Sequence, residues 1–168
     1  ELSMPEIGTG AFLLKRDGGE HKIRKIGDRY EREALDIHME LLERGFKLPA
    51  ITGLEKKEDG EYSYVEWVKG KTFWELYHEN ALGDEDFYKL GEFVAKIHNE
   101  EIKGKNVSFL NYFHKNVFKY DTGEVIVIDL NKMFYAPYPE AFLDKYILTE
   151  DIVTFSQRDA FLEGYRKH

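Results

Sequence analysis

Apolar and polar residues alternate with a period of two in the first part of the chain, a pattern typical of β-strands. It predicts three short strands over Met4–Gly10, Ala11–Arg16 and His21–Ile26. Asp17–Gly19 interrupts the alternation with the residue types of a tight hairpin turn. We therefore expect the chain to open with a small antiparallel sheet.

A helical period follows the third strand. Asp28 is a residue type that caps helices, and apolar residues then recur every three or four positions to about Arg44, before Gly45. Beyond this helix, Pro49–Lys56 and Glu61–Val68 alternate as a second hairpin. The first part of the chain thus predicts five strands, with one helix after the third.

The period becomes mainly helical from residue 71 onward. We expect a short helix over Phe73–Glu79, a longer one over Asp84–Asn99 and a closing helix over Asp151–Arg166. One further hairpin is predicted between Val117–Tyr120 and Glu124–Leu130. Helices therefore dominate the second part of the chain.

Strands first and helices afterwards indicate an α+β fold with two lobes. We expect a single domain over residues 1–168. A five-stranded antiparallel N-terminal lobe with one helix would cover residues 1–67, and a mainly helical C-terminal lobe residues 68–168. The lobes would meet near Trp67–Gly70.

Composition narrows the classes of function. A net charge of −8 argues against a broad nucleic-acid surface, and the lack of any run of eighteen apolar residues predicts no membrane span. The chain has no cysteine, which excludes disulfides, thiolate metal sites and a cysteine nucleophile. Together with the lack of a basic and then apolar leader, this favours a cytoplasmic protein.

The turn Gly8-Thr9-Gly10-Ala11 lies between the first two predicted strands. Because glycine has no Cβ, the backbone N–H groups of such a turn can approach a phosphate closely. A Gly-x-Gly turn is also common in ordinary hairpins. Taken alone, the Gly-x-Gly pattern is more often a plain hairpin turn than a phosphate-binding loop.

Two oxygen-bearing side chains flank the hairpin that starts near residue 117. Asp129 follows four apolar residues at a strand end, which predicts a carboxylate at the rim of a cleft. Asn116 and Asp129 offer the hard oxygen ligands that suit Mg²⁺. The alternative is a structural turn asparagine with a capping aspartate. His114, in the preceding loop, is a further candidate base.

The order and spacing of these segments resemble the protein-kinase-like phosphotransferases. The likeness is closest to the small atypical members: aminoglycoside/choline-kinase-like enzymes, RIO-type kinases and lipopolysaccharide sugar kinases. It covers nearly the whole chain, including Leu90–His98 as the helix before the catalytic loop. The resemblance implies ATP and Mg²⁺ as cofactors, and a hydroxyl acceptor on a protein, a sugar or a small molecule.

The resemblance also assigns roles on the third strand and the first helix. It implies that Lys25 binds the α- and β-phosphates and is paired with Glu33, with Lys22 and Glu31 as the alternatives. Lys25 is the first choice because Ile23 would share its face and line an adenine pocket.

Further roles follow from the same resemblance. The carbonyl of Glu66 and the amide of Val68 would hydrogen-bond adenine, Gly8–Ala11 would cradle the phosphates, and Asn116 with Asp129 would hold Mg²⁺.

The position of the catalytic base departs from the family. It holds Asn111, and an amide cannot accept the proton of the attacking hydroxyl. Three interpretations follow: a phosphotransferase whose base is replaced, a natural pseudokinase that binds nucleotide and docks partners, or an interaction domain with accidental matches. The retained metal ligands favour the first.

Overall fold

The computed structural model describes residues 6–8, 11–16, 19–109, 116–128, 130, 133–142 and 153–168. Within residues 6–22, and at residue 142, it describes only the backbone. Several residues singled out by the sequence lie outside the described residues: Thr9, Gly10, Asn111, His114 and Asp129, together with Asp151, where the closing helix was expected to begin. The fold and the site are therefore built from the surrounding elements.

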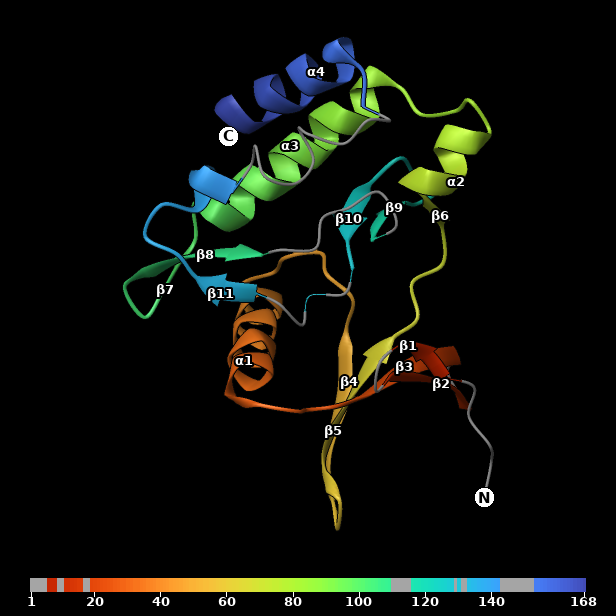
Figure 1. The fold of residues 1–168 in the computed structure, drawn as a ribbon, viewed down its shortest axis with the longest axis vertical. Coiled ribbons are helices and arrows are strands. Elements are labelled where there is room, and N and C mark those ends of the chain that lie inside the picture. The colour runs from red at the N-terminus through yellow and green to blue at the C-terminus, as the bar shows by residue number, and fades with distance from the viewer. Residues whose placement is uncertain are drawn as a thin grey trace.

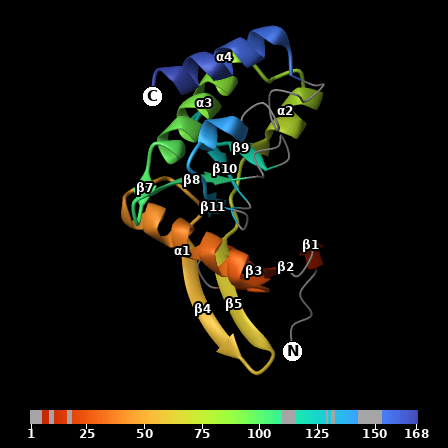
Figure 2. The same cartoon turned by 60° about the vertical axis from the view of Figure 1, so that its left-hand side comes forward.

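Five strands form an antiparallel sheet in the order β1-β2-β3-β5-β4 (Figure 1). The strands are β1 (Glu6–Gly8), β2 (Ala11–Arg16), β3 (Gly19–Lys25), β4 (Ile51–Lys57) and β5 (Gly60–Glu66). The β4–β5 hairpin extends well beyond the other strands (Figures 1 and 2). The predicted mixture of antiparallel strands and helices is confirmed.

Helix α1 (Arg29–Glu43) connects β3 to β4. Asp28 caps it, because its Oδ1 accepts hydrogen bonds of 2.9 Å from the amides of Tyr30 and Glu31. Gly45 ends it with a φ of 87°, which a residue with a side chain rarely adopts. These local signals explain why the predicted helix is confirmed almost to the residue.

Three more helices follow: α2 (Phe73–His78), α3 (Asp84–His98) and α4 (Phe155–Arg166). Helices α3 and α4 lie side by side and run in the same direction (Figures 1 and 2), with Asp84 hydrogen-bonded to Ser156 at their starts and His98 to Tyr165 at their ends. Their backbones touch, because a Cβ added at Gly91 would lie 2.1 Å from the carbonyl oxygen of Phe161. A Cβ at Gly164 would lie equally close to the carbonyl oxygen of Tyr88.

Two small antiparallel sheets lie between α1 and these helices. One has the order β10-β9-β6, from β6 (Lys71–Thr72), β9 (Val117–Lys119) and β10 (Val125–Val127). The other has the order β11-β8-β7, from β7 (Glu101–Ile102), β8 (Lys105–Phe109) and β11 (Met133–Tyr135). A 3₁₀ helix follows over Pro139–Phe142. The sequence predicts the β9–β10 hairpin but misses the second sheet.

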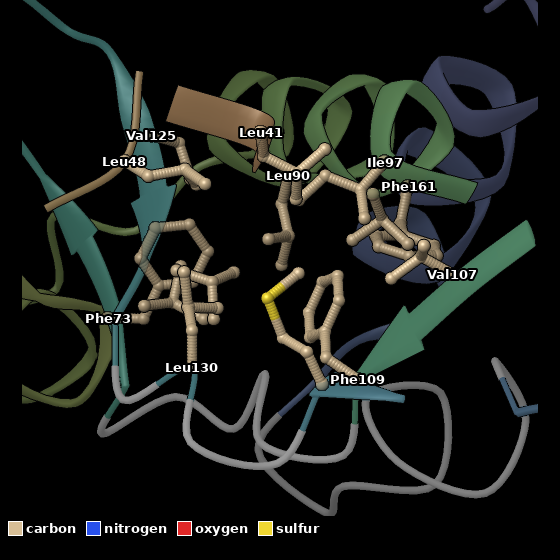
Figure 3. Packing of buried hydrophobic residues seen from close by; sticks show 14 of the residues in the cluster. Leu41, Leu48, Phe73, Leu90, Ile97, Val107, Phe109, Val125, Leu130 and Phe161 are labelled. Carbon is tan, nitrogen blue, oxygen red and sulfur yellow. The ribbon is translucent and has the colours of Figure 1, made fainter. Parts of the chain in front are cut away.

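The main hydrophobic core joins α1 to the second part of the chain. Leu41 and Leu48 pack in one cluster with residues of α3, β8, β10 and α4 (Figure 3). The five-stranded sheet contributes a separate small cluster, in which Ile23 and Tyr64 are buried and Tyr62 packs against them. By packing, α1 therefore belongs with the helices. No described helix is long and apolar enough to cross a membrane.

Candidate functional site: a cleft between the sheet and the β9–β10 hairpin

A cleft that is partly open to solvent is bounded by β3, β5, α1 and the β9–β10 hairpin. Its walls are mainly apolar, with Leu35, Val65, Val68, Phe118, Ile128 and Leu130 among the residues that line it. A concave site with mainly apolar walls is the kind of site in which proteins bind small organic ligands.

The linker after β5 forms one wall of the cleft. The amide of Glu66 donates to the carbonyl of Ala50 at 2.9 Å, and the amide of Ala50 donates back to Glu66 Oε1 at 2.9 Å. Trp67 is exposed, whereas Val68 is buried and lines the cleft with Glu66. Within the described residues no acceptor is paired with the Val68 amide. The two linker residues predicted from the sequence are thus brought together here.

The register of β3 against β5 sets which face each side chain takes. Arg24 pairs with Ser63, and both line the cleft. Ile23 pairs with Tyr64 and is buried against it on the opposite face. The expectation that Ile23 lines the cleft is therefore wrong, because the antiparallel register turns its side chain away.

Lys25 also lines the cleft, but its ammonium group lies near the β4–β5 turn. It pairs with Tyr62, and its Nζ is 4.0 Å from the Asp59 carboxylate at the β4–β5 turn. The backbone register pairs Lys22 with Val65, a residue of the cleft wall. Among the β3 side chains that the structure describes, Arg24 is therefore the one that both lines the cleft and pairs with a β5 residue of the cleft wall.

The two candidate glutamates of α1 separate clearly. Glu31 lines the cleft, and its carboxylate accepts a hydrogen bond from the Gly27 amide. Glu33 is not among the residues that line the cleft. Its carboxylate lies near Tyr135 instead: burial raises the pKa of the Tyr135 hydroxyl, and the negative charge of Glu33 raises it further. Among the ion pairs of the described residues there is none between Lys25 and Glu33.

The β9–β10 hairpin places Asn116, one of the two predicted metal ligands, beside Ile128, whereas Asp129 lies outside the described residues. Val117 pairs with Val127, and the Ile128 amide then donates to the Asn116 carbonyl at 2.8 Å. Asn116 therefore lies opposite the residue that precedes Asp129. No group of three or more His, Asp or Glu side chains suited to a metal occurs in the described part of the chain.

A buried ion pair that the sequence did not predict ties this hairpin to α3. Lys119 Nζ lies 2.6 Å from Oδ1 of Asp86, a carboxylate that is almost fully buried. The other oxygen of Asp86 accepts from the Gly83 amide at 2.9 Å, at the start of α3. Because both oxygens are bonded, the pair fixes the hairpin against the helix. The only sequence signal is an aspartate in the first helical turn.

A second buried polar network lies beside β8, between that strand and helices α3 and α4. His98 Nδ1 is 2.9 Å from the Tyr165 hydroxyl, and its Nε2 is 3.3 Å from Ser108 Oγ. Burial lowers the pKa of His98 to about 4 and raises that of Tyr165 to about 12. The network links α3 and α4 to β8.

The sheet with its inserted helix, the linker, and the hairpin that follows helix α3 define a protein-kinase-like fold. In particular, the chain is similar to the crystal structure of an aminoglycoside-3'-phosphotransferase of type VIII, with a TM-score of 0.67. That likeness covers 99% of this chain and 84% of the other, at 14% sequence identity, so it shows the fold alone. No family model and no curated protein matches the sequence.

Proposed function

We propose that the protein is an ATP- and Mg²⁺-dependent phosphotransferase that transfers the γ-phosphate to a hydroxyl acceptor. One observation carries the proposal: the Glu66–Val68 linker and the strand end that precedes Asp129 border the same apolar cleft. A nucleotide needs an apolar slot for its base and charged or metal-binding groups for its phosphates. The cleft offers the slot, and Asn116 and Asp129 offer the ligands.

In this proposal the linker holds the base. The Glu66 carbonyl accepts from the adenine amino group, and the Val68 amide, which has no partner among the described residues, donates to the ring. Leu130 and Phe118 pack against the ring faces. Gly8–Ala11 donates backbone N–H groups to the phosphates.

The metal and the charged side chains serve the phosphates. Mg²⁺ held by Asn116 and Asp129 would neutralise phosphate charge. Lys25, Lys22 and Arg24 are the β3 cations available to the α- and β-phosphates, and a carboxylate of α1 would orient the one that binds.

Asn111 decides between this function and its alternative. In a phosphotransferase the residue at this position takes the proton of the acceptor hydroxyl, which an amide cannot do. Because phosphoryl transfer depends mainly on positioning and charge, losing the base typically costs about 10²–10⁴-fold in rate rather than all activity. The second candidate is a pseudokinase that binds nucleotide without turnover, and the asparagine favours it.

The test compares ATP turnover, as phosphate release and self-labelling, in the unsubstituted protein and in Asn111→Asp. We expect the aspartate form to be faster by about a hundredfold or more. Asn80→Asp, which adds the same charge at an exposed turn, is the matched control and should change nothing. If both forms bind ATP but neither turns it over with protein, sugar or small-molecule hydroxyls, the pseudokinase proposal replaces this one.

A further inference from the structure

One wall of the cleft holds a buried histidine to which the sequence gives no role. His38 lies on α1, is 6% exposed and lines the cleft. Its Nε2 is 2.7 Å from the carbonyl oxygen of Pro49. A carbonyl oxygen can only accept, so Nε2 carries the proton and donates it.

The other ring nitrogen then follows by elimination. Burial lowers the pKa of His38 to about 4, so the ring is neutral at pH 7 and carries one proton. With that proton on Nε2, Nδ1 is an acceptor. Among the described residues no donor is paired with it. In the described part of the chain the fully buried polar atoms without a partner do not include Nδ1, so this atom is accessible and can accept a hydrogen bond from a ligand in the cleft.

The neighbours of His38 indicate which ligand edge it meets. Pro49, which follows α1 in the chain, and Val65 of β5 also line the cleft. Ala50, next to Pro49, is hydrogen-bonded to Glu66 in both directions. His38 is therefore hydrogen-bonded to the short Pro49–Ala50 segment that also holds Glu66 of the linker.

We infer that His38 Nδ1 accepts a hydrogen bond from the exocyclic amino group of a 6-aminopurine, and so contributes to base specificity. The inference rests on the proposed function. An amino group carries two hydrogens, which matches two acceptors, the Glu66 carbonyl and Nδ1. A 6-oxopurine presents an oxygen to both acceptors, and a purine without a 6-substituent leaves both unsatisfied. His38 thus adds a second determinant that the linker alone does not supply.

The experiment uses two nucleosides that differ only in the amino group, adenosine and purine riboside. Their dissociation constants are measured by calorimetry for the natural protein and for His38→Phe. We expect the preference for adenosine to fall by about five- to tenfold in the variant, the effect of one hydrogen bond. A purely structural role of His38 would weaken both nucleosides equally and leave their ratio unchanged. An unchanged ratio overturns the inference.

A second measurement needs no variant. Long-range ¹H–¹⁵N spectra report the state of each histidine ring nitrogen. The Nδ1 signal of His38 should shift when adenosine binds and stay in place when purine riboside binds. Equal shifts with both nucleosides overturn the inference even if His38→Phe does not fold. If the natural protein binds neither adenosine nor ATP, the proposed function itself fails, which is a separate result.

Discussion

Three basic residues follow one another closely on β3, and the pairing with β5 decides which of them meets a ligand. The sequence shows a basic strand and suggests Lys25. It cannot give the register, because that is set by contacts with β5, some forty residues away along the chain. In the structure Arg24 pairs with Ser63 of the cleft, whereas Lys25 lies near Asp59.

This register yields a prediction for the phosphate-binding cation. Arg24→Ala should weaken ATP binding by about tenfold or more, as expected for a charged hydrogen bond to phosphate, and Lys25→Ala should weaken it less. Titration calorimetry with ATP measures both. Adenosine, which lacks phosphates, is the control ligand and should bind both variants like the natural protein. A larger loss for Lys25→Ala would return the phosphate role to Lys25.

The two buried histidines give the protein a predictable response to acid. Burial lowers the pKa of His38 and of His98 to about 4, below the unfolded value near 6.5. The unfolded chain therefore binds more protons between these values, and stability is lost as the pH falls from about 6.5 to 4. From pH 7 to pH 5 each histidine should cost about 2 kcal/mol of unfolding free energy.

Urea unfolding at pH 7 and pH 5 measures this loss. His98→Phe should reduce the difference between the two pH values by about half, because one of the two groups no longer titrates. His78→Phe is the matched substitution at an exposed position. An equal pH dependence in the natural protein and in His98→Phe would contradict the assignment of a neutral buried ring.

At the scale of elements, local signals decide what the sequence can predict. The helices are predicted well because residues next to their ends in the sequence determine where they begin and end. Thr154, for example, forms a capping box with Gln157 at the start of α4. Strands β8 and β11 are missed because each is short and pairs with a segment more than twenty residues away. The positive φ of Lys103 and Gly104 marks the β7–β8 turn. In the sequence, the glycine at this position is a local signal for that turn.

The β9–β10 hairpin carries the prediction about the metal. Asp129→Ala should abolish the part of ATP stabilisation that depends on Mg²⁺, because the proposed ligand is removed. We compare the protein without nucleotide with the protein in the presence of Mg²⁺ and ATP, the ATP being at a hundredfold excess over its dissociation constant. The melting temperature of the unsubstituted protein should be roughly 5 °C higher in the second condition. Melting curves with and without Mg²⁺ measure the effect.

Asp121→Ala is the control for this experiment, because Asp121 is an exposed residue of the turn in the same hairpin. It should keep the full Mg²⁺-dependent shift. A shift that survives in Asp129→Ala would remove Asp129 from the metal site, even if ATP still binds.

At the scale of the whole molecule, helices α3 and α4 meet backbone to backbone at Gly91 and Gly164. Gly164→Ala should destabilise the protein by at least about 2 kcal/mol, because the added methyl group meets the backbone of Tyr88, which cannot move aside. This outweighs the roughly 1 kcal/mol by which alanine favours a helix. Urea unfolding measures the change.

Gly53→Ala provides the comparison. A Cβ there would meet only the Tyr64 side chain, at an ordinary distance of 3.8 Å. This substitution should be close to neutral. Equal stability losses in the two variants would mean that the helices separate more easily than the backbone contact implies.

The fold itself was predictable from the sequence at low resolution, although no family model matches. The order of strands, helix, linker and hairpin was sufficient to predict the fold, because each element shows its own hydrophobic periodicity or its own turn residues in the sequence. The division into lobes at residue 67 stays a prediction. The position of α1 was not predictable, because an amphipathic helix shows that one face is buried but not against which partner.

That position has a consequence for how the molecule opens. Since Leu41 and its neighbours on α1 belong to the main core, the helix and the second part of the chain form one cooperative unit. The five-stranded sheet has its own smaller cluster and is joined to that unit by short connections near residues 27, 50 and 67. The sheet can therefore exchange its amide protons, or swing so that the cleft widens, while α1 keeps its place as a fixed wall of the cleft.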